Sequence, residues 1–375
     1  MTKKKVILLK ADKYDRNLLI DAIKSVLDNH FSLENVLKSR KVLLKPNLLS
    51  PVPADYAITT NPVFIEAVGC VFKERGLDVY IADNPSIFST DVNVERVYRE
   101  TKVKDLADRH GFKLLYPTSS YVVDGIPLSE WSRQFTIINL PKLKTHNITV
   151  ITCAVKNLYG CISGAYKSRL HKMYTRTEDF VRVLFKLYNT INPPLTIVDA
   201  VVSLEGEGPA TGGTPRYTGF IAIGDDALSV DYAVSRVIGL PIEKNPLISF
   251  TKRQGCFKEE DIEVVQGGID FTIDDFKFPK GISLNNIPKF LVNAIGPFIK
   301  IYPQVFKEEC TGCGDCSKIC PAKAISIKSK KSNIDYSKCI QCMCCFEVCR
   351  FKAIKVKESF LLRLIRFFQG LKKIL

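Results

Sequence analysis

Residues 310–321 read CTGCGDCSKICP, and residues 339–350 read CIQCMCCFEVCR. Both stretches have the cysteine spacing C-x2-C-x2-C-x3-C, and matching cysteines lie 29 positions apart. The same offset places Lys323-Ala324-Ile325 on Lys352-Ala353-Ile354. We infer an internal duplication, in which neither half is large enough to form a core alone.

The cysteine spacing predicts two [4Fe-4S] clusters in a small α+β ferredoxin-like domain. Three cysteines in a tight loop reach three corners of one iron–sulfur cube, and in bacterial two-cluster ferredoxins the fourth cysteine of each run ligates the other cluster. By that rule, one cluster is held by Cys310, Cys313, Cys316 and Cys349. The other is held by Cys339, Cys342, Cys345 and Cys320. Zinc is the alternative metal, but structural zinc sites prefer two separated ligand pairs around one tetrahedron.

Two positions depart from the repeat. Arg350 stands where the first run has Pro321, so we expect a less rigid turn after the last cysteine. Cys344 is a ninth cysteine in this segment, and because the repeat register makes Cys345 the ligand, we expect Cys344 to be a spare buried thiol. The other cysteines are scattered singly, as core cysteines usually are: Cys70, Cys153, Cys161 and Cys256.

The cysteine-rich segment is basic. From Lys307 to Lys357 it holds eleven basic and five acidic residues, a balance of +6. Since a cluster with four thiolates is anionic, nearby positive charge stabilises its reduced state. A positive face also suits an acidic electron carrier, a free ferredoxin or flavodoxin, which we expect to deliver electrons here. The whole chain has a net charge of +15, but its lysines are scattered without a helix-turn-helix or zinc-finger spacing, so we predict no nucleic-acid partner.

The first 280 or so residues predict an α/β domain with a mostly parallel sheet. Helical patterns lie between several short β-branched runs, which favours a parallel sheet with helices on both faces. Tyr14–His30 places its apolar residues on one face, and a second helix begins at Pro62 and ends before Gly76. The expected strands are Val6–Leu9, Val42–Leu44, Val79–Ala82, Lys113–Leu115, Phe135–Asn139, Leu195–Asp199 and Phe220–Gly224.

We expect four segments along the chain. The α/β domain covers residues 1–285, a proline-containing connector covers 286–306, the ferredoxin-like domain covers 307–357, and a tail helix covers 358–375. The tail is basic and amphipathic, so it suits an anionic membrane surface, its own ferredoxin-like domain or a partner subunit. No apolar run reaches the length of a membrane span or a signal peptide. We therefore expect a cytoplasmic protein with, at most, peripheral membrane contact through the tail.

Several stretches of the first domain resemble one known family. They are VLLKPN (42–47), TTNP (59–62), PKLKTH (141–146), VKNLYG (155–160), His171, IVDA (197–200) and GEGP (206–209). The chain is similar in these stretches to the family called domain of unknown function 362, which is often fused to a two-cluster ferredoxin. The resemblance covers about two thirds of the chain in addition to the cysteine-rich segment. It implies no particular reaction.

Those stretches share cationic or titratable side chains near the ends of expected strands. In open α/β sheets, ligands bind outside the carboxyl ends of the strands. We predict that these side chains converge on one anionic small-molecule substrate, and that the two histidines exchange protons near neutral pH. The alternative is that surface lysines lie near strand ends in any basic protein. The candidate catalytic residues are Lys45, Lys144, His146, Lys156 and His171, with Lys142 beside them.

The segment 206–213, GEGPATGG, is rich in glycine but matches neither the Walker pattern nor G-x-G-x-x-G. Because Pro209 also removes one N–H donor, we expect a mobile loop or a lid over a site rather than a phosphate cradle. Asp199 ends an expected strand just before this loop and is a candidate for orienting a lysine or binding a metal. No nucleotide or flavin fingerprint is recognised, so a bound flavin stays undetermined.

Two functions are consistent with these features. The first is an oxidoreductase that passes electrons through two [4Fe-4S] clusters to an anionic substrate in the α/β domain. The second is a non-catalytic electron-transfer subunit whose α/β domain docks a redox partner. The large α/β domain favours the first, because an electron carrier alone needs only about sixty residues.

Overall fold

The structure is a computed structural model of the 375-residue chain. It describes residues 3–37, 39–85, 91–164, 166–174, 176–210, 212–267, 272–279, 301–360 and 363. The chain divides into two compact units. The first comprises residues 1–209 and 213–279, and the second comprises residues 210–212 and 280–375.

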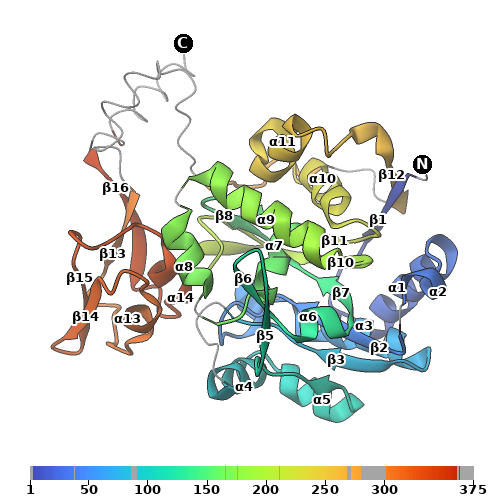
Figure 1. Cartoon of the computed structure of the whole chain (residues 1–375), viewed down its shortest axis with the longest axis horizontal. Helices are drawn as coiled ribbons and strands as arrows, with labels where there is room; N and C mark the ends of the chain where they lie inside the picture. The colour runs from blue at the N-terminus through green and yellow to red at the C-terminus, as the bar shows by residue number, and fades with distance from the viewer. Residues whose placement is uncertain are drawn as a thin grey trace. The chain divides into compact units, whose positions relative to one another are not determined.

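The first unit is built on a ten-stranded sheet of described residues, with the order β12-β1-β11-β10-β7-β2-β3-β4 (Figure 1). The pairs from β10 through β7, β2 and β3 to β4 are parallel, as is β1 with β12, whereas β11 is antiparallel to β1 and β10. Two more strands branch off, because β8 pairs with β10 and β9. The bounds are β1 (Lys4–Lys10), β2 (Lys41–Pro46), β3 (Asp78–Ile81), β4 (Lys113–Leu114), β7 (Thr136–Leu140), β8 (Lys142–His146), β9 (Val150–Thr152), β10 (Leu195–Gly206), β11 (Gly213–Gly224) and β12 (Ile262–Gly267). The predicted α/β fold with a mostly parallel sheet is confirmed.

Helices cover both faces of this sheet. Successive strand residues point to opposite faces, so Val6 and Leu8 of β1 lie in one hydrophobic core and Ile7 lies in the other. The core that contains Val6 includes residues of α7 (Ala154–Asn157), α9 (Thr177–Ile191), α10 (Ala227–Val237) and α11 (Pro246–Arg253). The core that contains Ile7 includes residues of α1 (Arg16–His30), α3 (Pro62–Glu74), α4 (Asp91–Glu100) and α5 (Val103–His110).

The remaining elements of the first unit are short. A hairpin joins β5 (Ser120–Val123) to β6 (Ile126–Ser129), and the short helices are α2 (Leu33–Val36), α6 (Trp131–Gln134) and α8 (Tyr166–Met173). Among the described residues, no helix combines the length and the apolar content that crossing a bilayer requires.

The helix ends follow from local capping chemistry. Asp15 precedes α1, and its carboxylate accepts hydrogen bonds from the N–H groups of Asn17 and Leu18. Asn61 precedes α3 and accepts from the N–H of Val63, while Pro62 occupies the first helical position, where its missing N–H costs nothing. α3 therefore begins at Pro62 as expected, whereas α1 begins at Arg16, two residues after the expected start at Tyr14.

The second unit repeats one strand-and-helix pattern twice. Its elements are β13 (Ile301–Val305), α13 (Asp315–Ile319), β14 (Ile325–Lys328), β15 (Lys331–Ile334), α14 (Cys344–Val348) and β16 (Ile354–Glu358). β14 pairs with β15, and β13 pairs with β16, both antiparallel. β13 pairs with the last strand, β16, so the strand pairing of this unit includes Ile301–Val305, which lies at the end of the expected connector. Of the expected tail helix, only residues 358–360 and 363 are described, and Glu358 belongs to β16.

Candidate functional site

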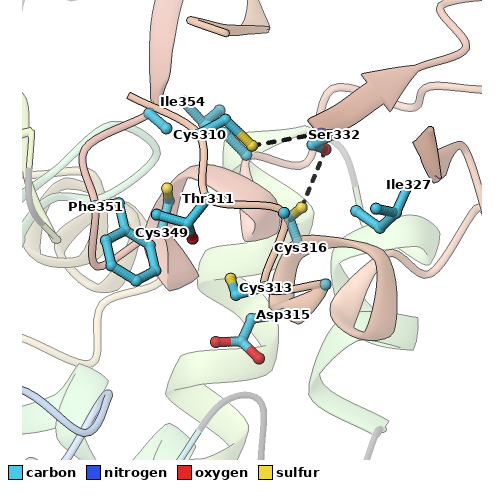
Figure 2. Close-up of a pocket in the computed structure, with 13 residues that line it drawn as sticks. Cys310, Thr311, Cys313, Asp315, Cys316, Ile327, Ser332, Cys349, Phe351 and Ile354 are labelled. Carbon is cyan, nitrogen blue, oxygen red and sulfur yellow. Dashed lines mark hydrogen bonds between the residues drawn. The ribbon is translucent and has the colours of Figure 1, made fainter. Parts of the chain in front are cut away.

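A cavity of about 330 Å³, named site I here, lies among cysteines of both runs (Figure 2). It is lined by Cys310, Cys313 and Cys316 of the first run and by Cys349 from the end of the second run. Figure 2 shows these four side chains around one space, next to Ser332 of β15. Site I therefore draws three thiols from one half of the repeat and the fourth from the other half.

A second cavity of about 300 Å³, named site II here, has the complementary composition. Its lining includes three cysteines of the second run and one of the first, which are Cys339, Cys342, Cys345 and Cys320. Cys344 and Pro303 also line it. This placement matches the grouping that the repeat predicts, and cluster ligation by these groups stays a prediction.

The backbone that presents the thiols is repeated as well. Gly312 and Gly314 of the first run have φ values of 71° and 83°, and the equivalent Gln341 and Met343 of the second run have 58° and 61°. These left-handed residues turn the chain between successive cysteines. Gly312 is also required by space, because a Cβ there would lie 2.3 Å from the carbonyl oxygen of Lys330.

Polar hydrogens already point at several sulfur atoms. The N–H of Ser332 donates to the Sγ of Cys310 at 3.3 Å, and the hydroxyl of Ser332 lies 3.2 Å from the Sγ of Cys316. At site II, the N–H of Ala324 donates to the Sγ of Cys320 at 3.2 Å. Such N–H groups stabilise thiolates, which are the metal-binding form of cysteine.

Burial alone works against thiolate formation at these sites. Desolvation raises the pKa of Cys316 and raises that of Cys345 well above its usual range. A bound cationic metal reverses this, since a coordinating thiol is deprotonated outright. Cys316 and Cys345 therefore depend on a metal partner in order to ionise near neutral pH.

The donor set fits an iron–sulfur cubane. Site I is lined by four thiols, and site II by five, because Cys344 joins the four predicted ligands there. Sulfur donors are the ligands that iron–sulfur clusters use. The thiols surround a space, and in the described part of the chain no three His, Cys, Asp or Glu side chains meet around a single-ion position.

The candidate lysines of the first unit are buried, beginning with Lys45 at the end of β2. Its ammonium pairs with Asp83 at 2.7 Å, and both side chains are almost fully buried. The pair leaves room for nothing larger than glycine at position 160, because a Cβ on Gly160 would lie 2.2 Å from Asp83 Oδ1 and 2.5 Å from Lys45 Nζ. Lys45 lies within β2, next to its last residue, instead of after the strand as expected, and its charge is neutralised inside the protein.

Lys142 is held in the same way. Its ammonium lies 3.0 Å from the carboxylate of Asp199 and donates to the hydroxyl of Tyr14 at 2.8 Å. Tyr14 in turn donates to Asp199 at 2.7 Å. Burial lowers the pKa of Lys142, and the charge of Asp199 opposes that shift. Asp199 lies within β10 instead of ending it, and it orients a lysine, one of the two roles expected for it.

Lys144 and His146 belong to a strand that sequence patterns do not indicate. We expected residues 142–146 in a loop after a strand, but they form β8 themselves and are buried along its length. Lys142, Lys144 and His146 alternate with apolar or small residues, so the three point to one face of β8. The strand forms despite its polar sequence because Asp199 and the loop after β2 supply partners for its cations.

The contacts of this face define its chemistry. Lys144 Nζ donates to Asn47 Oδ1 at 2.6 Å and to the carbonyl oxygen of Ile58 at 2.8 Å. His146 Nδ1 accepts hydrogen bonds from the N–H groups of Ile148 and Thr149, at 3.0 and 3.3 Å. With Nδ1 engaged as an acceptor, the neutral imidazole carries its proton on Nε2.

Two asparagines connect Lys144 to Lys45. Asn47 accepts from Lys144 and donates through Nδ2 to Asn157 Oδ1 at 2.9 Å, and Lys45 Nζ lies 3.4 Å from the same oxygen. Sequence reasoning missed both asparagines, although they belong to the stretches VLLKPN and VKNLYG that carry the family resemblance. The structure therefore brings Lys45 and Lys144 together, through amide bridges instead of around an open pocket.

The other two candidate residues lie on helices. Lys156 is on α7, half-buried, and its ammonium donates to Thr152 Oγ1 at 3.3 Å. His171 is on α8, and its side chain lies outside the described residues. The first turn of α7 is held by Asp231, whose carboxylate accepts from the N–H groups of Ala154 and Val155. Burial raises the pKa of Asp231 to about 7, and sequence patterns did not single this residue out.

The glycine-rich segment 206–213 connects β10 to β11. The N–H of Gly208 donates to Thr145 Oγ1 at 3.2 Å, and a Cβ on Gly208 would lie 2.4 Å from the carbonyl oxygen of Thr145. Gly208 therefore packs against β8 at Thr145, the residue between Lys144 and His146. The expected mobile loop or lid over a site stays a prediction.

Comparison with known proteins finds a family match for each part of the chain. Residues 42–236 match the family described as "Domain of unknown function (DUF362)", and residues 303–350 match a 4Fe-4S dicluster domain. The "Thylakoid-associated protein sll1697" of Synechocystis sp. is 28% identical over 260 residues, which cover 67% of this chain and 80% of that protein. The first match spans more than half of the chain, and the second contains both cysteine runs. The protein is a member of the DUF362 family with a C-terminal 4Fe-4S dicluster domain.

Proposed function

We propose that this protein is an iron–sulfur oxidoreductase that moves single electrons through two [4Fe-4S] clusters. One cluster is held at site I by Cys310, Cys313, Cys316 and Cys349. The other is held at site II by Cys320, Cys339, Cys342 and Cys345. The observation that carries the proposal is the pair of cavities, each lined by the three predicted ligands of one run and the last cysteine of the other.

The bound clusters supply reversible one-electron chemistry, and the chain's own residues hold and surround them. Short left-handed turns place the thiols, and Ser332 and Ala324 direct polar hydrogens at individual sulfur atoms. The basic surface of the unit, with a balance of +6, supports an acidic ferredoxin or flavodoxin as the electron donor. Reduction by such a carrier should slow as ionic strength rises.

For the first unit, we propose an anionic substrate near the face of β8 that carries Lys144 and His146. Lys156 lies on α7, which begins four residues after Val150, the residue of β9 that is paired with His146. In this proposal Lys144 and Lys156 attract the anion, and His146 exchanges a proton through Nε2, since Nδ1 accepts two backbone hydrogen bonds. Lys45 acts by holding Asp83 and Asn157 in place, and His171 remains a candidate proton donor.

A specific observation supports the second function, an electron-transfer subunit that docks a redox partner. Lys45 and Lys142 are paired with buried carboxylates, so their charges are neutralised inside the protein. Fewer candidate cations are then left for a substrate than the sequence suggests. Under this alternative the lysines stabilise the α/β fold, and recognition occurs on its surface.

Anaerobic purification of the full chain tests the electron-transfer proposal. We expect about eight irons and eight sulfides per chain, and paramagnetic signals after reduction with dithionite. Colourless protein that holds zinc and gives no paramagnetic signal would contradict it.

The two roles of the first unit are separated by a search for small molecules that co-purify with the protein. Retention of an anionic molecule by the wild type and by Lys10→Gln, an exposed control, but not by Lys144→Gln with intact clusters, supports the oxidoreductase. Equal binding by all three proteins, or no bound molecule, supports the docking subunit.

A further inference from the structure

Sites I and II are related by the repeat, and strand register identifies which residues are equivalent. Ser332 of β15 pairs with Ile327, and Pro303 of β13 pairs with Val356. The offset of 29 residues that relates the cysteines also relates Pro303 to Ser332 and Ile327 to Val356. Ser332 lines site I and Pro303 lines site II. The two residues therefore occupy the same position beside the two cavities.

These equivalent residues differ in what they offer to sulfur. Ser332 supplies two hydrogen-bond donors, its N–H to Cys310 and its hydroxyl to Cys316, at 3.3 and 3.2 Å (Figure 2). A ligating thiolate can only accept, so the hydroxyl of Ser332 is the donor whenever Cys316 binds a metal. Proline has neither an N–H nor a hydroxyl, so Pro303 supplies neither of these hydrogen bonds to site II.

A second difference lies after the last cysteine of each run. Arg350 follows Cys349 of site I, whereas the neutral Pro321 follows Cys320 of site II. The guanidinium of Arg350 is 5.1 Å from the ring centre of Phe351, which lines site I. Its Nε is buried and has no hydrogen-bond partner among the described residues. A positive charge with an unused donor thus lies beside site I, whereas Lys338, which precedes Cys339 of site II, is paired with Asp335.

Two other differences between the sites are smaller. The lining of site I includes Asp315 where site II has Cys344, but in Figure 2 the carboxylate of Asp315 points away from the sulfur atoms of Cys310 and Cys316. The thiol of Cys344 lies 3.9 Å from the carbonyl oxygen of Cys342 and also hydrogen-bonds to the Cys342 side chain, which lowers the pKa of Cys342, but a thiol is a weaker donor than a hydroxyl.

The other backbone donors are similar in number at the two sites. At site I, the N–H groups of Ala353, Ile354 and Phe351 donate to Cys349. At site II, the N–H groups of Ala324, Gln341 and Cys344 donate to Cys320, Cys339 and Cys342, respectively. The difference between Ser332 and Pro303 is therefore not offset by these donors.

Hydrogen bonds to the sulfurs and nearby positive charge both stabilise the reduced form of a cluster, which carries one more negative charge. Building on the proposed two-cluster function, we propose that the cluster at site I has the higher reduction potential. The first electron that enters the unit then reduces the cluster at site I. An electron that enters at site II passes on to site I, which oxidises one cluster and reduces the other by one electron without any bond or proton change. Ser332 is the main positioning residue for this order, and Arg350 adds to it.

Redox titration of the anaerobic full chain, followed by electron paramagnetic resonance, tests the order of the clusters. For the wild type we expect two one-electron steps. Ser332→Ala removes the hydroxyl donor and should shift the upper step to lower potential while the lower step stays in place. Pro303→Ser adds a hydroxyl and an N–H at site II and should shift the lower step upward. Ser326→Ala, an exposed serine on the neighbouring β14, serves as the matched control and should shift neither step.

The outcomes separate the order of the clusters from their presence. Loss of irons or of paramagnetic signals in the wild type contradicts the proposed function itself. A full set of clusters in which Ser332→Ala moves the lower step, or moves neither step, overturns the inference alone. If Ser332→Ala fails to fold, Arg350→Gln carries the same test, because its loss of charge should also lower only the upper step.

Discussion

Lys142, Asp199 and Tyr14 form a closed set of hydrogen bonds inside the first unit. Neither charged side chain is more than 1% exposed. Taking two charges out of water is costly, so such a pair adds little net stability compared with apolar residues of the same size. Removing only one partner is much worse, because the other charge stays buried without compensation.

We therefore expect Lys142→Met to lower the free energy of unfolding by about 3–5 kcal/mol. The double variant Lys142→Met/Asp199→Asn should recover part of this loss, since no buried charge is left. Denaturation with guanidinium, followed by circular dichroism, measures both. Lys10→Met, which breaks the exposed pair with Asp12, is the control and should cost less than about 1 kcal/mol. A single variant as stable as the wild type would show that the pair does not support the core.

Asp231 gives the first unit a defined dependence on pH. Burial raises its pKa to about 7 in the folded protein, from a usual value of 3.8. Between these values the folded state holds a proton that the unfolded state has lost, so the free energy of unfolding should fall as pH rises toward 7, by roughly 1 kcal/mol per pH unit. Asp231→Asn should flatten this decline in denaturation measured from pH 5 to 8. A variant with the same slope as the wild type would assign the decline to other groups.

At the scale of elements, β8 is a strand that sequence patterns do not predict. The apolar runs that became β1, β2, β3, β7, β10 and β11 are read directly from β-branched residues. The strand Lys142–His146 is not, because three of its five residues are cationic or titratable. Its burial depends on Asp199 and Asn47, which lie 57 and 97 residues from their lysine partners. Sequence spacing does not reveal partners that meet only after the sheet has formed.

The loop after β10 offers a matched pair of glycine substitutions. Gly208→Ala would place a Cβ 2.4 Å from the carbonyl oxygen of Thr145, so it should displace the loop from β8. Gly206→Ala meets nothing within 4 Å but must adopt a φ of 79°, which costs on the order of 1 kcal/mol. We expect Gly208→Ala to lose clearly more unfolding free energy than Gly206→Ala in denaturation experiments. Equal losses would mean that the contact with Thr145 contributes nothing.

At the scale of the whole molecule, the two units differ in how far their sites follow from sequence. The cysteines are grouped as the repeat predicts, because ligand spacing and duplication are local and are both visible in the printed residues. The difference between Ser332 and Pro303 can also be found by applying the 29-residue offset to the sequence. Only the pairing of β13 with β16, however, shows that the two residues occupy equivalent positions. In the first unit, three quoted motifs, VLLKPN, PKLKTH and VKNLYG, contain these lysines and asparagines, yet their ion pairs and amide bridges emerge only from the assembled sheet.

The central claim, that two clusters are held by cysteines exchanged between the runs, is tested most directly by counting iron in two double variants. Cys313→Ala/Cys349→Ala removes two ligands of site I, so the protein should retain about four irons per chain. Cys313→Ala/Cys320→Ala removes one ligand from each site, so both clusters should be weakened and little iron retained. If each run holds its own cluster, the results are reversed, with iron lost in the first variant and about four irons kept in the second, and that outcome would contradict the account.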